Sequence, residues 1–279
     1  MMVNLTPERI EIVSFYDDGE DARHYQFRLL DDEQRISPAW LQAQGGQFFM
    51  LSVPGVGEAP FTFTTLPDEQ GNFRALVRKM GAVTQALFGC HSGDVLGARG
   101  PFGRGWPVTE LAEQRILVIG GGCGMAPLVS VIAQLIEQQH FAQLEVLYAA
   151  RSKAALMLNP EREQWQHCIP MFTAVEDMTG LNEHGYYLGT ATGILPTVLH
   201  AFGEQPDRVL LAGPETMMSA IAEYLVAYEV EPEAIYLSIE RRMHCAVGLC
   251  GHCYLNEKYV CTDGPTFSWA ELCALQSDV

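Results

Sequence analysis

Four cysteines near the end of the chain restrict what this sequence can fold into more than any other feature. They are separated by four, two and seven residues, and they are Cys245, Cys250, Cys253 and Cys261. This is the plant-type spacing of a [2Fe–2S] cluster site. Gly248 and Gly251 let the loop fold around inorganic atoms and point its amides at sulfur. The spacing therefore predicts a [2Fe–2S] site with these four thiolates as ligands.

Two other interpretations of the cysteines remain open. A structural zinc site is the main alternative, because His244 and His252 lie beside the thiols and histidine is a common zinc ligand. Unligated, buried cysteines are the second, although four thiols within 17 residues, flanked by charges, would pack a core poorly. Cys273 lies outside the spacing, and we interpret it as an ordinary buried thiol.

The composition excludes several classes of protein. A chain of 279 residues suggests two domains, or two with a small appendage. Apolar residues make up 48% and charged residues 18%, which is typical of folded domains and not of disordered chains. The formal net charge of −17 repels phosphate, so we expect no nucleic acid among the partners.

The cellular compartment decides whether the cysteines are expected to form disulfides, because thiols stay reduced in the cytosol. The residues from Met1 to Arg9 include Pro7 and Glu8 and lack an apolar core, so no secretory signal is visible. The longest uncharged stretch, residues 116–136, holds four glycines and a proline in its first half, which indicates a strand, a turn and a helix. We therefore expect a cytoplasmic protein with no membrane span, whose clustered cysteines bind metal.

The first 110 residues are predicted to be rich in strands. Short runs of β-branched and aromatic residues alternate with turn-forming residues, at Ile10–Tyr16, Tyr25–Leu30, Gln47–Val53, Phe61–Thr65 and Phe73–Arg78. This spacing indicates a small antiparallel barrel. Val83–Phe88 could add one or two helical turns, and Gly100–Gly103 is predicted to be a loop leading out.

From Arg115 onward strands alternate with helices, which implies a parallel sheet covered on both faces. Predicted strands are Ile116–Ile119, Leu144–Ala149, Met171–Val175, Arg208–Ala212 and Ile235–Ile239, and predicted helices are Ala126–Gln139, Ala155–Gln166 and Pro214–Tyr228. We therefore predict a β plus α/β fold. It has an antiparallel barrel at residues 1–110, an α/β domain at 111–233 and a small cluster-binding segment at 234–279.

A glycine turn follows the first α/β strand and opens a helix. Its residues are Gly120, Gly121, Gly122, Gly124, Met125, Ala126 and Pro127. Such a turn lets a phosphate approach backbone amides at a helix N-terminus, although strand-to-helix turns use glycine for packing as well. Arg151, near Lys153, could hold a 2′-phosphate or simply begin an exposed helix. Gly213, Pro214 and Met217 form a second loop at the carboxyl edge of the sheet, where ligands bind in such folds.

A barrel, a glycine-turn α/β domain and a Gly-Pro-x-x-Met loop together resemble the ferredoxin-NADP reductase superfamily. With the cysteine segment, the chain resembles three electron-transfer subunits more narrowly. These are the gamma (diaphorase) subunit of cytosolic nickel-iron hydrogenases or sulfhydrogenases, the NADH-oxidising subunit of anaerobic sulfite reductase, and the electron-transfer subunit of dihydroorotate dehydrogenase B. The most specific stretches are residues 238–243 and 259–265 on either side of the cysteines.

The resemblance implies an FAD site on the barrel. Its first motif falls on residues 59–62, so Pro60, Phe61 and Thr62 would line the flavin, but Ala59 replaces the arginine of the pattern. A second motif is intact, and its Gly81, Val83 and Thr84 would bind the pyrophosphate. Leu76, Val77 and Arg78 would line the ribityl chain and adenosine. Ala212 stands where the superfamily often has a cysteine over the nicotinamide.

The resemblance also implies the function. The chain would pass electrons between NAD(P)H, FAD and a [2Fe–2S] cluster, to or from an iron–sulfur partner and a hydrogenase catalytic subunit. The sulfite reductase and dihydroorotate dehydrogenase subunits are the alternatives, and Ala59 and Ala212 motivate a flavin-free binding or regulatory module as a less favoured one. The cofactors would perform the chemistry, so we expect no catalytic side chain. The six histidines outside the cysteine loop, among them His24, are interpreted as surface or packing residues.

Overall fold

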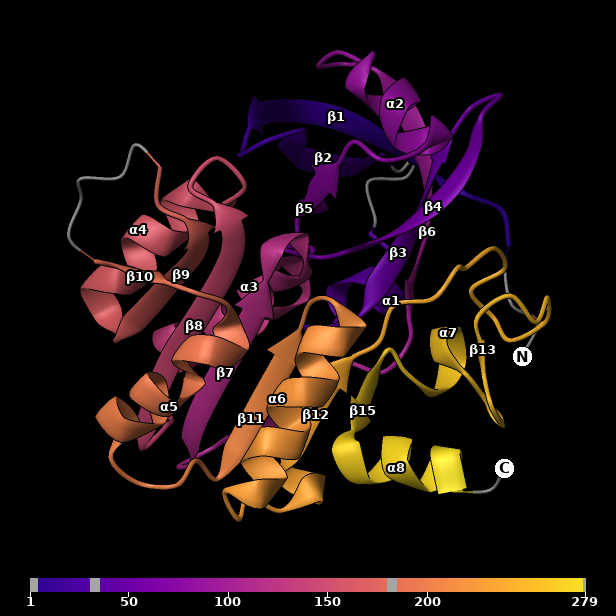
Figure 1. Ribbon diagram of the computed structural model, residues 1–279. Helices are drawn as coiled ribbons and strands as arrows, with labels where there is room; N and C mark the ends of the chain where they lie inside the picture. The colour runs from indigo at the N-terminus through magenta and orange to yellow at the C-terminus, as the bar shows by residue number, and fades with distance from the viewer. Residues whose placement is uncertain (1–4, 31–35, 180–184, 278–279) are drawn as a thin grey trace.

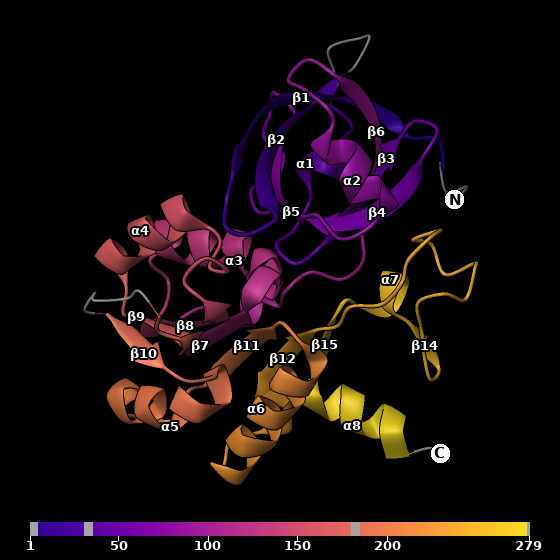
Figure 2. The same ribbon diagram turned by 45° about the horizontal axis from the view of Figure 1, so that its top comes forward.

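The computed structural model describes residues 5–30, 36–179 and 185–277, which form a β-barrel above an open α/β sheet in Figure 1. Six antiparallel strands make the barrel, in the order β4-β3-β6-β1-β2-β5. They are β1 (Glu8–Asp17), β2 (Ala22–Leu30), β3 (Phe48–Val53), β4 (Gly57–Thr62), β5 (Asn72–Arg78) and β6 (Val95–Phe102). Hydrogen bonds from Thr64 N to Arg74 O (2.9 Å) and from Arg74 N to Thr65 O (3.1 Å) close the barrel, which Figure 2 shows turned toward the viewer.

Aromatic side chains fill the barrel, because alternate residues of each strand point inward. The ring centroids of Phe49 and Phe63 lie 4.9 Å apart, and both side chains are fully buried. The short helix α1 (Pro38–Leu41) adds Trp40, whose ring stacks on Phe73 at 5.6 Å. Helix α2 (Ala82–Phe88) follows β5 and buries Leu87 in the same core.

Seven strands form the second sheet, in the order β10-β9-β8-β7-β11-β12-β15, and all neighbours are parallel except β12 and β15. The strands are β7 (Arg115–Gly121), β8 (Gln143–Ser152), β9 (Met171–Asp177), β10 (Tyr186–Leu188), β11 (Arg208–Ala212), β12 (Ile235–Ser238) and β15 (Thr266–Ser268). The α-helices are α3 (Ala126–Gln138), α4 (Asn159–Cys168), α5 (Ala191–Phe202), α6 (Glu215–Ala227), α7 (Val260–Asp263) and α8 (Trp269–Ser277). Short elements complete the fold: the 3₁₀ turns η1 (Val108–Glu110), η2 (Gly122–Met125) and η3 (Pro232–Ala234), and the hairpin of β13 (Tyr254–Leu255) and β14 (Lys258–Tyr259).

Each face of the second sheet has its own apolar core. Ile116 and Val118 of β7 belong to the core shared with α3 and α4, whereas Leu117 and Ile119 belong to the core shared with α5 and α6. This alternation follows from the two-residue repeat of a strand and explains why β7 is apolar throughout.

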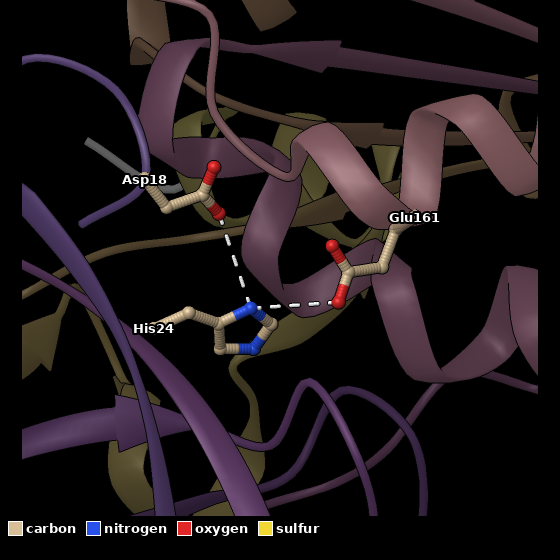
Figure 3. Close-up of side chains that lie close together, drawn as sticks. All are labelled: Asp18, His24 and Glu161. Carbon is tan, nitrogen blue, oxygen red and sulfur yellow. Dashed lines mark ion pairs between the residues drawn. The ribbon is translucent and has the colours of Figure 1, made fainter. Parts of the chain in front are cut away.

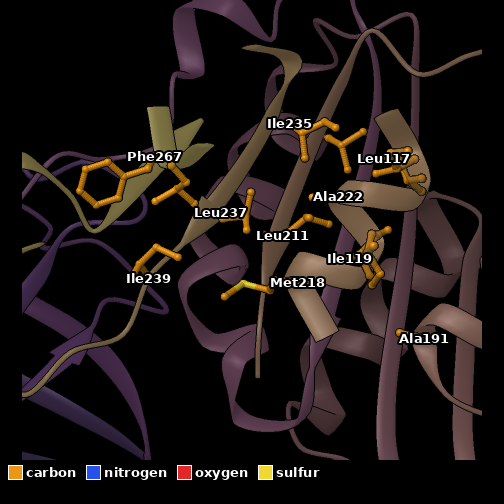
Figure 4. Packing of buried hydrophobic residues seen from close by; sticks show 14 of the residues in the cluster. Leu117, Ile119, Ala191, Leu211, Met218, Ala222, Ile235, Leu237, Ile239 and Phe267 are labelled. Atoms are coloured by element: carbon orange, nitrogen blue, oxygen red, sulfur yellow. The ribbon is translucent and has the colours of Figure 1, made fainter. Parts of the chain in front are cut away.

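The core under α5 and α6 continues into the cysteine-rich segment. Figure 4 shows Phe267 of β15 and Ile239 beside Leu237 of β12 in this packing, and Cys253 and Cys261 belong to the same cluster. Because β12 and β15 are also strands of the second sheet, the cysteine segment is joined to the α/β domain by backbone hydrogen bonds and by a common core.

The structure confirms the predicted fold class, with a barrel followed by a sheet that is parallel except at its last strand. Two predictions for the barrel are wrong, one of a strand and one of a loop. The strand expected at Phe61–Thr65 begins earlier, at Gly57, because glycine and proline there hid a strand that pairs with β3. The loop expected at Gly100–Gly103 lies mostly within β6, which pairs with both β1 and β3.

One predicted helix begins later than expected, and α5 was not predicted. The helix expected from Ala155 starts at Asn159, after Leu158 with a φ of 61°. Helix α5 contains Gly193 and Pro196, which interrupt the helical pattern in the sequence. The uncharged stretch at residues 116–136 divides into β7, η2 and α3, as expected. No helix in the described part of the chain is long and apolar enough to span a bilayer.

Candidate functional site

Two cavities meet where the barrel, the α/β domain and the cysteine segment come together. The first, here called the inner cavity, has a volume of about 280 Å³ and is lined from all three parts, by Phe61, Cys123 and Met243 among others. The second, the turn cavity, has about 580 Å³ and lies over the glycine turn and the loop after β11. Concave sites of this size suit parts of a large cofactor.

Four side chains line both cavities and so mark their junction: Arg78, Met80, Cys123 and Glu240. Burial raises the pKa of the Cys123 thiol, the charge of Glu240 raises it further, and Arg78 opposes the rise. Burial also raises the pKa of Glu240. The junction is thus a partly desolvated place where a ligand in one cavity would contact a ligand in the other.

The predicted flavin residues of the barrel lie at the inner cavity, with one exception. Five of them line it at the ends of β4 and β5: Pro60, Phe61, Thr62, Leu76 and Arg78. Val77 is fully buried in the barrel core, because neighbouring residues of a strand point to opposite faces. The side chain of Val77 therefore faces away from the cavity, and only its backbone is near.

The predicted pyrophosphate turn at the start of α2 is held by its own threonine. The N–H groups of Met80 and Gly81 both donate to Thr84 Oγ1 at 2.9 Å, and this hydroxyl donates to Gly81 O at 3.0 Å. The first amides of the helix, at Ala82 and Val83, have no carbonyl one turn earlier to accept from them. Gly81, Val83 and Thr84 lie outside both cavities, next to Met80 at the junction.

The glycines of the turn divide into two kinds. A Cβ on Gly124 would lie 2.3 Å from Gly213 Cα, and one on Gly121 would lie 2.7 Å from Met217 Sδ. Packing of the turn against the loop after β11 therefore requires these two. Gly122, with a φ of 55°, has open space where a Cβ would project, and it lines the turn cavity. Unlike Gly121 and Gly124, Gly122 therefore leaves room for a phosphate to approach its backbone.

The rest of the turn is also fixed by packing. A Cβ on Gly120 would overlap Met125, which is fully buried. Ala126 and Pro127 begin α3 and line the inner cavity. The hydroxyl of Tyr148, on β8, donates to the carbonyl of Gly122 at 3.1 Å and so stabilises the turn.

Arg151 lines the turn cavity at the end of β8, together with Ser152. The carboxylates of Glu20 and Glu176 line the same cavity, so this end of it is not uniformly basic. Pro214 lines the cavity as well, whereas Met217 packs against the glycines.

The four predicted metal ligands lie close enough to affect one another's pKa. Cys253 and Cys261 are 1% exposed, whereas Cys250 is exposed. Backbone N–H groups, that of His252 first, lower the pKa of Cys250 to about 7, and Cys245 adds to this effect. Thiols this near to one another fit a site with several thiolate ligands.

Backbone amides of the cysteine loop point at sulfur. Val247 N and Leu249 N lie 3.5 and 3.3 Å from Cys245 Sγ, and Gly248 N lies 3.2 Å from Cys261 Sγ. Burial, followed by the neighbouring Cys253, raises the pKa of Cys261 to about 12. Hydrogen bonds to ligand sulfur are one way in which a protein sets the potential of an iron–sulfur cluster.

Arg99 of β6 anchors the cysteine loop to the barrel. Its guanidinium, 5% exposed, pairs with Glu58 through Nε–Oε1 (3.1 Å) and Nη2–Oε2 (2.5 Å). It also donates to the carbonyls of Cys245 (3.1 Å) and His244 (3.3 Å). Burial disfavours the ionised form of Glu58, but hydrogen bonds from Arg99 and Ser52 outweigh it and hold the pKa of Glu58 below its ordinary value.

A second arginine joins the same two parts nearer to the surface. Arg104, just after β6, donates from Nε to Thr266 O at 2.9 Å and pairs with Glu271 of α8 at 2.8 Å. Its side chain is 46% exposed, so this pair contributes less than the buried contacts of Arg99.

Sequence analysis did not identify Arg99, Tyr148 or Glu240 as residues of the site. Arg99 carried a weak signal as a single charge that follows the short apolar run Leu96–Ala98. Glu240 lies within the stretch 238–243 that carries the resemblance, but it was not named as a site residue. Tyr148 carried no signal, because its contacts come from other parts of the chain.

Three family models match consecutive parts of the chain. Residues 10–106 match the oxidoreductase FAD-binding domain and residues 118–223 the oxidoreductase NAD-binding domain. Residues 240–273 match the iron–sulfur cluster binding domain of dihydroorotate dehydrogenase B. The chain therefore uses FAD, NAD(P)H and an iron–sulfur cluster, which favours the cluster over the zinc interpretation and FAD binding over a flavin-free module.

Several curated proteins are similar along nearly their whole length. Sulfhydrogenase 1 subunit gamma of Pyrococcus furiosus is 30% identical over 281 residues, covering 98% of this chain and 95% of that protein. Sulfhydrogenase 2 subunit gamma of the same organism is 28% identical and covers 80% of this chain and 82% of that protein. A probable dihydroorotate dehydrogenase B (NAD(+)) electron transfer subunit of Thermococcus kodakarensis is 29% identical, covering 95% of this chain and 98% of that protein.

Solved structures share the fold at lower identity. An NADH-dependent reduced ferredoxin-NADP oxidoreductase superposes with a TM-score of 0.73 at 23% identity, covering 100% of this chain and 95% of that one. The FAD/NAD-binding domain of nitric oxide dioxygenase from Vibrio cholerae superposes with a TM-score of 0.70 at 18% identity, covering 84% of this chain and 99% of that one.

Proposed function

Because the chain belongs to the family that contains the sulfhydrogenase gamma subunits and the dihydroorotate dehydrogenase B electron-transfer subunits, we propose that it is the diaphorase subunit of a hydrogenase complex. It is an NAD(P)H-dependent flavin and iron–sulfur oxidoreductase subunit. The proposal concerns its partners: an iron–sulfur electron-transfer subunit and, beyond it, a hydrogenase catalytic subunit.

The observation that carries the choice of a hydrogenase partner is the similarity, over nearly the whole chain, to sulfhydrogenase 1 subunit gamma. The junction of the two cavities supports the electron-transfer role on which that choice rests. The inner cavity is lined by barrel, glycine turn and cysteine segment at once, and it opens to the turn cavity past Arg78 and Glu240. A flavin ring in the inner cavity would have the nicotinamide on one side and the cysteine loop nearby. This order is what a chain of electron carriers requires, because transfer depends on close contact.

Particular residues would hold each group. The flavin would lie along Pro60, Phe61, Thr62, Leu76, Val77 and Arg78, with its pyrophosphate at Gly81, Val83 and Thr84. NAD(P)H would lie in the turn cavity, against Gly121, Gly122, Gly124, Arg151, Gly213 and Pro214. The other predicted residues of this site, Gly120, Met125, Ala126, Pro127 and Met217, would support the turn by packing. The cluster would be ligated by Cys245, Cys250, Cys253 and Cys261. FAD supplies the exchange between two-electron and one-electron carriers.

The side chains of the protein orient these groups and control access to them. Phe61 and Met243 present apolar surface in the inner cavity. Arg78 would supply the positive charge that is lost because Ala59 replaces the arginine of the first flavin motif. Arg99 holds the start of the cysteine loop on the barrel. Each of these residues acts by placing a cofactor and not by moving a proton.

Exposed side chains near the cysteine loop support docking of the partner there. Cys250 is exposed, and the apolar side chains of Leu249 and Tyr254 are 78% and 56% exposed. An exposed apolar patch beside a redox centre is typical of a surface that another subunit covers.

The second candidate is the electron-transfer subunit of a dihydroorotate dehydrogenase. The match of residues 240–273 to the cluster-binding domain of that enzyme favours it, and the two classes of relative are almost equally similar. The difference between the candidates lies in the partner and not in the chemistry of this chain.

Anaerobic purification of the full chain tests the cofactors. We expect the absorbance of flavin and of a [2Fe–2S] cluster together, and reduction of a dye that depends on NAD(P)H. A chain with cluster but no releasable flavin and no dye reduction would refute the diaphorase assignment.

Isolation of the tagged chain with its native partners tests the complex. We expect NAD(P)H-linked production or uptake of hydrogen in the isolated complex. Dihydroorotate-dependent reduction of NAD⁺ would instead support the second candidate, and neither activity would refute both.

We also retain the functional division proposed from the sequence, with FAD on residues 1–110, NAD(P)H on 111–233 and the cluster on 234–279. Thiolate ligands of an iron–sulfur cluster must stay reduced, which supports a cytoplasmic location. A protease-resistant, cluster-binding fragment of residues 234–279 is not expected, because β12 and β15 belong to the sheet of the preceding domain.

A further inference from the structure

A buried histidine between two carboxylates joins the barrel to the α/β domain, away from the two cavities. Figure 3 shows His24 of β2 with Asp18, from the turn after β1, and Glu161 of α4. His24 Nδ1 lies 3.4 Å from Glu161 Oε1 and 3.9 Å from Asp18 Oδ2. One atom from each of the three side chains falls within 4.8 Å of the other two. We propose that Asp18, His24 and Glu161 bind a zinc ion that fastens helix α4 to the barrel.

The distances fit a zinc site. Zinc binds imidazole nitrogen and carboxylate oxygen at about 2.0 to 2.2 Å in tetrahedral geometry, so neighbouring ligand atoms lie roughly 3.3 to 3.6 Å apart. The Nδ1–Oε1 separation already has this length, and the Nδ1–Oδ2 separation exceeds it by a few tenths of an ångström. A small movement of side chains would complete the three-ligand set.

The contact of the second ring nitrogen of His24 leaves Nδ1 for the metal. Nε2 lies 2.6 Å from Thr64 Oγ1, a hydroxyl that can accept from an N–H. With the proton on Nε2, the lone pair of Nδ1 points between the two carboxylates. A neutral imidazole in this tautomer is the form that ligates a metal.

The two carboxylates differ in how well their oxygens are hydrogen bonded. Asp18 accepts from the N–H groups of Leu158 (2.8 Å) and Asn159 (3.2 Å), which fixes its orientation at the start of α4. Glu161 Oε2 is buried with no hydrogen-bond partner among the described residues. The side chains of Asp18 and His24 are 0% exposed and that of Glu161 is 17% exposed.

The hydroxyl of Tyr16 now faces Nδ1 of His24. Tyr16 Oη lies 2.6 Å from this nitrogen, and the Tyr16 residue is 36% exposed. Because the ring lies at the surface, it can turn outward and leave its place to an ion. A cavity of about 540 Å³ is lined by Gly19, which follows Asp18 in the chain, and by Asn159, which donates to Asp18, but by none of the three proposed ligands. Asn159 also donates to Asp18 through Nδ2 at 3.2 Å.

The zinc ion would stabilise the position of α4 against the barrel and would take no part in electron transfer. Figure 1 shows α4 on the side of the molecule opposite to the C-terminal segment, so an ion there would hold the edge of the interface that Arg99 does not reach. Its three ligands come from two domains whose relative position sets the junction of the cavities.

The test uses the full chain with flavin and cluster intact, purified anaerobically. Metal analysis is expected to find about one zinc per chain, or isothermal titration with zinc chloride to show one site with a dissociation constant at or below about 1 μM. X-ray absorption at the zinc edge should show nitrogen and oxygen neighbours only. Sulfur neighbours near 2.3 Å would place zinc in the cysteine loop and overturn the proposal.

Three variants locate the ion. Glu161→Gln and His24→Ala should each weaken zinc binding at least tenfold, and Glu161→Gln should fold normally because it removes a buried charge. His91→Ala is the matched control, since His91 is 86% exposed and also lies 3.9 Å from a carboxylate, that of Asp94. Equal zinc binding in the wild type and Glu161→Gln, a dissociation constant above about 100 μM, or loss of zinc in His91→Ala would overturn the proposal.

Discussion

Replacing Arg99 with methionine should release the cysteine loop from the barrel. The side chain of Arg99 is 5% exposed and donates to the carbonyls of Cys245 and His244, which begin the loop. Methionine keeps the apolar length of the side chain but makes none of these bonds. It also leaves Glu58, whose side chain is 26% exposed, with the hydroxyl of Ser52 as its remaining donor.

The size of the effect follows from the bonds that are lost. A hydrogen bond from a charged donor contributes about 1.5 to 3 kcal/mol, so two carbonyl contacts at the lower figure give about 3 kcal/mol. At about 1.4 kcal/mol per tenfold change, the loop should open roughly a hundredfold more often. Breaking the pair with Glu58 adds to the loss of overall stability, to a total of about 3 to 5 kcal/mol. The double variant Arg99→Met/Glu58→Met should recover the part due to the unpaired carboxylate, but not the faster opening.

The rate of cluster loss under anaerobic conditions with an iron chelator measures the opening of the loop. We expect bleaching up to about a hundredfold faster in Arg99→Met, with NAD(P)H-dependent reduction of the flavin largely retained. Arg104→Met is the matched control, because Arg104 is 46% exposed and its pair with Glu271 is a surface pair. Bleaching at the wild-type rate in Arg99→Met, or an equal effect of Arg104→Met, would show that Arg99 does not hold the loop.

Three further changes test other parts of the molecule. Cys250→Ser should bleach the cluster yet leave hydride transfer from NAD(P)H to flavin intact in stopped-flow absorbance, and loss of both would contradict separate sites. Gly124→Ala should weaken NAD(P)H binding at least tenfold in a fluorescence titration while FAD stays bound, because its Cβ would meet the backbone of Gly213 at 2.3 Å. Asp207, whose pKa Arg115 lowers to about 2, contributes stability that is present above its ordinary value of 3.8 and is lost as the pH falls toward 2. Asp207→Asn should therefore lower the melting temperature at pH 7 and flatten its dependence on pH between about 4 and 2; an unchanged profile would contradict this pairing.

The sequence predicted those elements whose structure depends on residues close together in the chain. The apolar strand β7, the glycine turn and helix α3 are examples, and all three lie within residues 115–138. The cysteine spacing predicted one cluster-binding segment, and the iron–sulfur cluster binding domain matches residues 240–273, which contain all four cysteines. Strand β6 and helix α5 were missed because glycine and proline lie within them, and neighbours elsewhere in the fold stabilise both.

Contacts between distant parts of the chain could not be predicted in this way. Arg99 meets Cys245 across 146 positions, and Asp18 meets Leu158 across 140. No periodicity or motif in the sequence indicates either contact, because each residue fits the strand, turn or loop in which it lies. His24 shows the same limit: as one residue of a barrel strand it was interpreted as a surface or packing residue, and only the fold places it between two carboxylates.

These distant contacts determine how the three parts are oriented. The barrel has a core of its own, and its Ala22, Phe48, Met50 and Leu76 also pack into the two cores of the α/β domain. Apolar contact of this kind is not directional. Hydrogen bonds and ion pairs depend on direction, and they occur at two edges of the interface: Arg99 and Arg104 beside the cysteine segment, and Asp18 at the start of α4. The cavities and their junction lie between these edges. A change at the start of α4 should therefore slow hydride transfer without touching a cofactor, because it would tilt the barrel relative to the glycine turn, whereas loss of Arg99 acts first on the cysteine loop.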